Sequence, residues 1–218
     1  MIKAVIFDMD GVLVNSIPFH LEIFKEVMAP YGVALTKEIF DEVNGMDTKN
    51  ISKYLVERFS LDVDHKIIAE EKTRIVDERI KKGLPLFEGA KETLNRLKAE
   101  GFLIAIGTSS RKESLESSIG PYLPELAVDR IVTDADVKNA KPAPDIYLKC
   151  AEVLGLRPDE CVVIEDAKNG ITAAKRAGML AIGITTTSDA DVLKDADAII
   201  TSITDLDAGL IRSLQEEK

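Results

Sequence analysis

The chain has 218 residues, enough for one large domain or for one domain with a small insert. Its hydrophobic content of 45% is that of an ordinary globular protein. The formal net charge of −10 argues against a general binder of nucleic-acid backbones, because an acidic surface repels polyanions. No apolar run approaches the length of a membrane span, and no secretory signal pattern begins the chain. We therefore expect a cytoplasmic protein, a monomer, without membrane or nucleic-acid partners.

The first predicted element is a strand over residues 3–7, KAVIF, which runs directly into Asp8, Met9, Asp10 and Gly11. On an extended backbone the side chains of Asp8 and Asp10 would project to the same side, close enough to repel. Two close carboxylates cost free energy unless a cation, a shared proton or a reaction uses them. The pair is therefore either a solvated Asp-Gly turn or part of a functional site.

Residues 15–83 read as amphipathic helices, and no strand is predicted among them. Their aromatic residues supply enough bulk for a small apolar core separate from the sheet. We expect a helical cap domain of residues 15–83, inserted into a core domain of residues 1–14 and 84–218. Two connections would join the domains and permit a hinge. The predicted helices lie at 19–32, 36–45, 50–60 and 64–83.

From residue 84 onward, short apolar strands alternate with helices. Continuous apolar strands between helices indicate a parallel sheet that is covered on both faces. The predicted fold class is α/β, a Rossmann-like parallel sheet with helices on both faces, plus the inserted α-helical cap. The predicted strands lie at 102–108, 130–136, 161–167, 180–186 and 196–202, and the helices at 111–120, 144–155, 169–178 and the C-terminus. The two cysteines on these elements have no metal-ligand spacing, and we expect buried thiols in a reducing cytosol.

Ligands of an open parallel sheet bind beyond the carboxyl ends of its strands, so polar residues there are candidates for a site. Hydroxyls and backbone N–H groups that follow a strand and precede a helix can bind an anion. Each residue also has a plain alternative, as a helix cap, a solvated loop lysine or an acid at a helix start. Their convergence at one edge predicts a site. They are Asp8, Asp10, Thr108, Ser109, Ser110, Lys141, Glu165 and Asp166.

Phosphoryl transfer is the chemistry that needs such a set. Mg²⁺ takes oxygen ligands and commonly pairs one or two carboxylates with phosphate and water, so it would make the acidic cluster tolerable. One carboxylate can attack phosphorus, and a second can protonate the leaving oxygen and later deprotonate water. The other groups would neutralise charge and align the reactants. The pKa of Asp10 stays open, because neighbouring carboxylates raise it and a metal lowers it.

The residues at this edge resemble the four motifs of the haloacid dehalogenase (HAD) superfamily. The first motif, DxDx(T/V), is DMDGV from Asp8, and the second, an apolar strand ending in Ser or Thr, is LIAIGTS. The third, a Lys before Pro, is KPAPD from Lys141, and the fourth is VVIEDAKNGI. Their order and spacing span the chain, and the helical insert resembles the cap of the subgroup that contains β-phosphoglucomutases and small phosphatases.

The resemblance implies a role for each matched acid. Asp8 would be the nucleophile and a metal ligand. Asp10 would be the general acid and base, and would ligate Mg²⁺ through its backbone carbonyl. Asp166 would complete the magnesium site, with Glu165 binding directly or through water. The dehalogenase branch of the family lacks such a metal site and does not fit these two acids.

The resemblance also implies that Thr108, Ser109 and Lys141 bind the transferring phosphoryl group. In the cap, His20 and Lys72 match groups that engage Asp10 on cap closure in mutase-like members. Their plain alternatives are a histidine that touches the hinge and a solvated lysine. Gly45 marks a cap loop that bears on substrate identity.

The chain departs from the mutase pattern in that same loop. β-Phosphoglucomutases supply an arginine to the distal phosphate of a bisphosphate, and Thr48 occupies that position here. Lys49 beside it offers a point charge rather than a bidentate clamp. Asn15 and Ala140 also differ from common family residues, and both leave the chemistry intact.

Three functions remain in competition. The first is a Mg²⁺-dependent phosphatase acting on a small-molecule phosphate ester, a sugar or polyol phosphate, through an aspartyl phosphate. The second is a β-phosphoglucomutase-type mutase. The third is a phospho-acceptor signalling module, which unites similar residues but lacks an inserted cap and takes its acceptor Asp from a middle strand.

Overall fold

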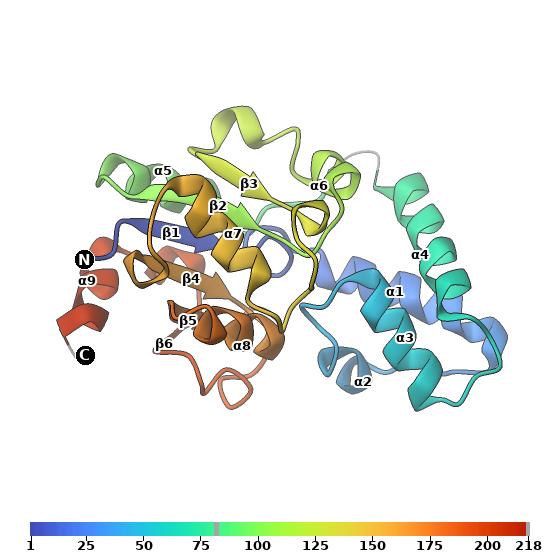
Figure 1. The fold of residues 1–218 in the computed structure, drawn as a ribbon. Helices are drawn as coiled ribbons and strands as arrows, with labels where there is room; N and C mark the ends of the chain where they lie inside the picture. Colours follow the sequence, from blue (N-terminus) through green and yellow to red (C-terminus); the bar gives the residue numbers. More distant parts are fainter. Residues whose placement is uncertain (81–82, 217–218) are drawn as a thin grey trace.

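Six parallel strands form the centre of the computed structural model, which describes residues 1–80 and 83–216 (Figure 1). The strand order is β3-β2-β1-β4-β5-β6, so the chain begins in the middle of the sheet. Every neighbouring pair is parallel, which confirms the predicted α/β class. The strands are β1 (Ala4–Phe7), β2 (Leu103–Gly107), β3 (Arg130–Val132), β4 (Cys161–Glu165), β5 (Leu180–Ile184) and β6 (Ala198–Ile200).

Side chains of β1 alternate between two apolar layers, because successive residues of a strand point to opposite faces. Val5 and Phe7 belong to one layer, and Ala4 and Ile6 belong to the other. Helices cover both layers, as the continuous apolar strands predicted. The helices are α5 (Ala90–Ala99), α6 (Lys112–Ser118) and α9 (Ala208–Glu216) on the first face, with α7 (Asp145–Leu154) and α8 (Lys168–Arg176) on the second.

Between β1 and β2 the chain forms a helical insertion, the helices α1–α4, beside the carboxyl edge of the sheet (Figure 1). It has its own apolar core, in which the rings of Phe24 and Phe40 lie 5.8 Å apart. The predicted insertion of helices is confirmed, while the domain limits stay a prediction. Residues 81–82, at the predicted end of the last cap helix, and 217–218 lie outside the described residues. The helices are α1 (Ile17–Met28), α2 (Lys37–Asp41), α3 (Thr48–Arg58) and α4 (His65–Arg79).

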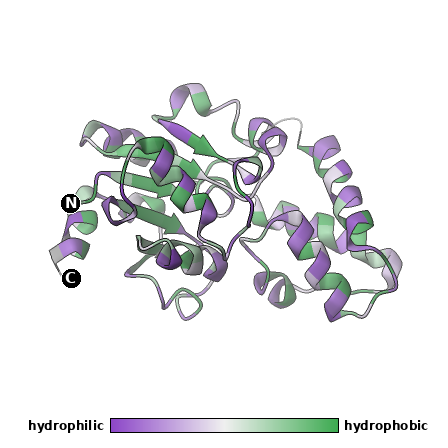
Figure 2. Cartoon of the chain, in the orientation of Figure 1, coloured by the Kyte–Doolittle hydropathy of each residue, from purple (hydrophilic) through white to green (hydrophobic). Residues whose placement is uncertain are grey.

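Hydropathy follows this layering. Figure 2 shows mostly hydrophobic strands in the sheet, and helices along which hydrophobic and hydrophilic residues alternate. Such amphipathic helices bury one face and leave the other in water. In the described part of the chain, no helix has both the length and the apolar character needed to cross a bilayer.

Polar caps set several element ends differently from the prediction. Asp47 accepts hydrogen bonds from the backbone N–H groups of Lys49 and Asn50, at 2.9 and 3.1 Å, so α3 begins two residues before its predicted start. The strand predicted over 130–136 ends early because the backbone N–H and hydroxyl of Thr133 donate to Asp136. Short 3₁₀ helices are η1 (Ala29–Tyr31), η2 (Leu123–Glu125), η3 (Asp134–Asp136), η4 (Pro158–Glu160) and η5 (Ile203–Asp205).

The helix predicted over residues 36–45 is also shorter. α2 ends at Asp41, and residues 42–46 form turns in which Gly45 has a φ of +83°. That left-handed conformation favours glycine. The turn brings Asn44 and Gly45 to the carboxyl edge of the sheet, where they contact residues that follow β2 and β4.

Leu55→Ala should test whether the insertion depends on its own core. Leu55 of α3 is fully buried there, so the substitution should lower the free energy of unfolding by about 2–5 kcal/mol. Chemical denaturation would measure the change. Lys53→Ala is the control, since Lys53 is exposed and its ion pair with Glu57 is long, at 3.8 Å. Equal stability of the two variants would contradict a packed core in the insertion.

Candidate active site

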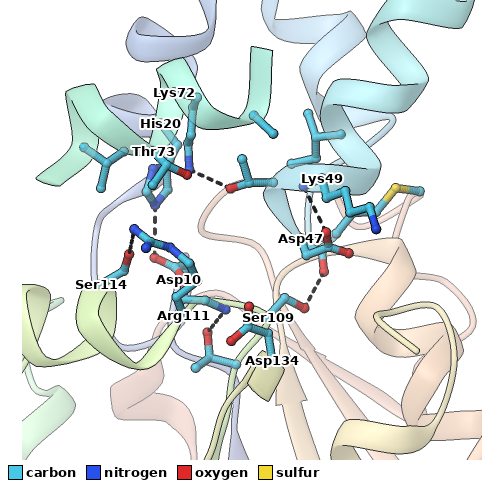
Figure 3. A pocket seen from close by; sticks show the side chains of 18 of the residues that line it. Asp10, His20, Asp47, Lys49, Lys72, Thr73, Ser109, Arg111, Ser114 and Asp134 are labelled. Atoms are coloured by element: carbon cyan, nitrogen blue, oxygen red, sulfur yellow. Dashed lines mark hydrogen bonds and ion pairs between the residues drawn. The ribbon is translucent and has the colours of Figure 1, made fainter. Parts of the chain in front are cut away.

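A pocket of about 280 Å³ lies between the carboxyl edge of the sheet and the helical insertion. Figure 3 shows His20 and Asp10 facing each other, with Lys72 on the side of the insertion and Ser109 and Arg111 on the side of the sheet. Every site residue predicted from the strand ends either lines this pocket or contacts a residue that does. The convergence predicted from sequence is therefore present in the fold.

The chain turns soon after the end of β1, and the backbone N–H of Asp8 still donates to the carbonyl of Ile164 on β4, at 3.0 Å. β1 ends at Phe7, and the carbonyl of Met9 accepts from the backbone N–H groups of residues 13 and 14. Gly11 in this turn has a φ of +83°, and a Cβ there would overlap the carboxylate of Asp166. Both aspartates still line the pocket, but each has its own hydrogen-bond partners.

Asp8 is paired with a buried ammonium group. Nζ of Lys141 donates to Oδ1 of Asp8 at 2.6 Å and to Oε1 of Glu165 at 2.8 Å, and the lysine side chain is 1% exposed. The hydroxyl of Tyr147 donates to the same Oε1 at 2.7 Å. A buried charge is tolerated only when it is paired and hydrogen-bonded, and this group satisfies both conditions.

Burial dominates the acid–base properties of these residues. Burial raises the pKa of Asp8 to about 7, against the attraction of Lys141 and with help from the charges of Glu165 and Asp10. It also raises the pKa of Asp166, with the repulsion of Glu165 and Asp8. Burial alone would lower the pKa of Lys141, but Asp8 and Glu165 hold it above its usual range. One lysine therefore faces an excess of carboxylates.

Three of these acids form a cluster that suits a hard cation. Asp8, Glu165 and Asp166 each offer an oxygen atom within 4.8 Å of the others, and all three are buried. Among the described residues, the hydrogen bonds to the Asp166 carboxylate all reach Oδ2, and none reaches Oδ1. An oxygen-only donor set, in which Oδ2 of Asp8 and Oδ1 of Asp166 accept no hydrogen bond from the described residues, fits a metal such as Mg²⁺.

The Asp10 carboxylate lies outside this cluster and is held by three donors. Oδ1 accepts from the Ser16 hydroxyl and lies 3.5 Å from Nε2 of His20, while Oδ2 accepts from Ser110 at 2.7 Å. Burial alone would raise the pKa of Asp10, but the hydrogen bonds and the charge of His20 bring it below its usual range. These partners favour the ionised form of Asp10.

The hydroxyl residues after β2 do not cap the following helix. Thr108 Oγ1 accepts from the backbone N–H of Ser110 at 3.0 Å, and Ser109 Oγ donates to the carbonyl of Gly45 at 3.2 Å. α6 begins only at Lys112. The alternative interpretation of Thr108 and Ser109 as an N-cap is therefore wrong. Thr108, Ser109 and Ser110 all line the pocket.

On the insertion, Lys72 is 8% exposed and donates to Oγ1 of Thr48 at 3.0 Å. Burial lowers the pKa of Lys72 to about 8. His20 Nδ1 is buried without a hydrogen-bond partner among the described residues, and burial and the charge of Lys72 lower the pKa of His20. Both side chains, with Gly45, line the pocket.

Sequence reasoning missed several residues of the site. Thr187 donates to Oδ2 of Asp166, and it follows β5 at the same edge, so the rule of strand ends could have found it. Asn44 donates to that oxygen from the insertion, and only its Asn-Gly dipeptide signalled a turn. Ser16 and Tyr147 carried no local signal, because their partners lie on other elements.

Comparison with known proteins supports one family. The family model of haloacid dehalogenase-like hydrolases matches residues 5–184. The fructose-1-phosphate phosphatase YqaB of Escherichia coli is 34% identical over 184 residues, which are 83% of this chain and 95% of YqaB. A phosphorylated carbohydrates phosphatase of Thermotoga maritima is 36% identical over 182 residues, which are 81% of this chain and 82% of that protein.

A solved structure shares the whole architecture. The β-phosphoglucomutase of Clostridium difficile superposes with a TM-score of 0.85, over 100% of this chain and 98% of that one, at 24% sequence identity. This likeness concerns the fold. The family match and the two relatives identify the family. The chain belongs to the haloacid dehalogenase-like hydrolases and is an enzyme of their phosphatase type.

Proposed function

We propose that the chain is a Mg²⁺-dependent phosphatase that hydrolyses a sugar or polyol phosphate through an aspartyl phosphate on Asp8. The placement of Asp8 carries the proposal. Oδ1 is held by Lys141, and among the described residues Oδ2 has no hydrogen bond, so it is free to attack. The residue lines the pocket and belongs to the acidic cluster.

The reaction would take two steps. Asp8 Oδ2 attacks phosphorus and forms a P–O bond as the bond from phosphorus to the ester oxygen breaks, and Asp10 gives its proton to that leaving oxygen. Asp10 then takes a proton from water, whose oxygen attacks phosphorus and releases inorganic phosphate and the Asp8 carboxylate. The hydrogen bonds that keep Asp10 ionised suit this second step, and for the first step Asp10 must carry a proton.

The remaining residues would hold the charged groups in line. Thr108, Ser109 and Lys141 would bind the transferring phosphoryl group, and Lys141 already balances part of the charge of the acids. Asp8, Asp166 and the backbone carbonyl of Asp10 would hold Mg²⁺, with Glu165 binding directly or through water. Bound there, Mg²⁺ would offset negative charge around phosphorus.

The insertion would act as a cap. Its separate apolar core and its pocket-lining residues support a domain of residues 15–83 that closes over substrate bound to the core of residues 1–14 and 84–218. The pocket of about 280 Å³ suits a small ester, and Asp47, Lys49 and Asp134 on its walls can pair with sugar hydroxyls. The printed activities of the two relatives, on fructose 1-phosphate and on phosphorylated carbohydrates, support this substrate class.

A sugar-phosphate mutase is the second candidate, because His20 lies 3.5 Å from Asp10 as the resemblance to mutase-like members implied. Thr48 at the position of the mutase arginine favours the phosphatase. Conversion of β-glucose 1-phosphate to the 6-phosphate, dependent on a bisphosphate activator, would decide for the mutase.

A panel of small phosphate esters should identify the substrate class. We expect release of inorganic phosphate, measured colorimetrically, to be fastest with a sugar or polyol monophosphate, because the pocket is small and has charged and hydroxyl side chains on its walls. Nucleotides and phosphoproteins, which are bulkier phosphate esters, should be poor substrates. Preference for one of these bulkier esters would contradict the proposed substrate class.

Asp8→Asn should abolish phosphate release, by at least about 10³-fold, because an amide cannot form the acyl phosphate. Circular dichroism should show an unchanged fold. Asp129→Asn is the matched control, since Asp129 pairs with Lys98 at 2.6 Å far from the pocket. Turnover by Asp8→Asn close to that of the control would mean that another group is the nucleophile.

Removal of divalent metal should silence the enzyme. After treatment with a chelator, phosphate release should fall to background, and added Mg²⁺ should restore it, because the acidic cluster then regains its counter-charge. Activity that persists in metal-free buffer would argue for metal-independent chemistry.

A further inference from the structure

The turn at Asn44 and Gly45 joins the helical insertion to the loops that follow the strands. The carbonyl of Asn44 accepts from the Asn169 side chain at 2.9 Å, and that of Gly45 accepts from Ser109 at 3.2 Å. A Cβ on Gly45 would lie 3.1 Å from the Cβ of Ala167, so the turn already sits close against the loop after β4. These contacts fix where the insertion touches the acidic cluster.

The side chain of Asn44 reaches one acid of that cluster. It is 5% exposed, and its Nδ2 donates to Oδ2 of Asp166 at 3.3 Å and to the Thr187 hydroxyl at 3.2 Å. Its own Oδ1 accepts from the backbone N–H of Gly45 at 3.1 Å, which orients the amide. The amide is therefore held so that its donor points at Asp166.

Two donors thus share Oδ2 of Asp166, one from each side of the pocket. Thr187 donates from the loop after β5 and stays with the sheet, whereas Asn44 belongs to the insertion. Oδ1 of Asp166 accepts no hydrogen bond from the described residues. A neutral amide can orient the carboxylate without the repulsion that a lysine there would exert on a cation.

We propose that Asn44 is a positioning residue that couples docking of the insertion to metal binding by Asp166. The inference rests on the proposed function, in which Asp166 holds Mg²⁺ and the insertion closes over substrate. When the insertion is docked, both donors hold Asp166; when it lifts away, only Thr187 does. By linkage, a ligand that keeps the insertion docked tightens Mg²⁺ binding, and Mg²⁺ tightens the binding of that ligand by the same factor.

Calorimetric titration of Mg²⁺, with and without saturating inorganic phosphate, measures this coupling without turnover. In the wild-type protein, phosphate should lower the Kd for Mg²⁺; direct contact of phosphate with the metal contributes equally in every variant. Asn44→Ala should reduce the ratio of the two Kd values by about fivefold. Asn44→Leu, which keeps most of the side-chain volume and lacks the donor, should do the same.

Two controls separate this role from general loosening of the insertion. Asp77→Asn removes the ion pair of Asp77 with Arg111, at 2.8 Å, which also joins the insertion to the sheet but lies apart from Asp166. It should leave the ratio within about twofold of wild type. Thr187→Val removes the donor on the sheet side and should weaken Mg²⁺ binding with and without phosphate.

The outcomes distinguish a failure of the proposed coupling from a failure of the proposed function. The coupling is wrong if both Asn44 variants show the wild-type ratio of Kd values while the protein binds Mg²⁺ and releases phosphate. That outcome would not contradict the proposed phosphatase function. An equal loss in Asp77→Asn and Asn44→Ala also overturns the coupling, since docking alone would then explain the effect. A wild-type protein that binds no Mg²⁺ overturns the metal-dependent function and the coupling together.

Discussion

The buried ammonium group of Lys141 contacts the carboxylates of Asp8 and Glu165, and the polar edge of the sheet is arranged around it. Without this cation, the acids at the ends of β1 and β4 would meet as unbalanced charges in the interior, at a cost of several kcal/mol. Tyr147 and the backbone N–H of Ala167 also donate to Glu165. The pairing uses Oδ1 of Asp8, and Oδ2 accepts no hydrogen bond from the described residues.

The parallel register places these groups side by side. Phe7 pairs with Ile164, so the residues that follow them, Asp8 and Glu165, are neighbours at the same level of the sheet. β2 flanks β1 on the other side and ends in the same plane, which brings Thr108 to the same pocket. A slip of one residue in either register would send one of these side chains to the opposite face.

The insertion contributes a different kind of constraint. Its own apolar core keeps its helices together, while polar contacts join its helices and the turn of Asn44 and Gly45 to the sheet edge. Because Asn44 donates to Asp166 and His20 lies beside Asp10, the insertion contacts the acids at the sheet edge as well as lining the pocket.

Much of the fold and the outline of the site could be predicted from sequence. Apolar runs between helices were sufficient for the parallel sheet, and residues at strand ends were sufficient for Asp8, Asp10, Thr108, Lys141, Glu165 and Asp166. Local chemistry explains this success, since a strand buried on both faces must be apolar, and polar groups must gather where it ends. Asp8 and Asp10 line the same pocket, and Gly11 turns the chain directly after them.

The partners of these residues could not be predicted. Tyr147 on Glu165, Ser16 on Asp10, and Asn44 with Thr187 on Asp166 come from elements that meet only in the folded chain. The low pKa of Asp10 likewise depends on donors from the insertion and from the loop after β2. The sequence by itself therefore determined which polar residues gather and at which edge of the sheet, through patterns that act over a few residues. Only the tertiary structure decided how each carboxylate is oriented and charged, because hydrogen bonds and burial depend on contacts between distant parts of the chain.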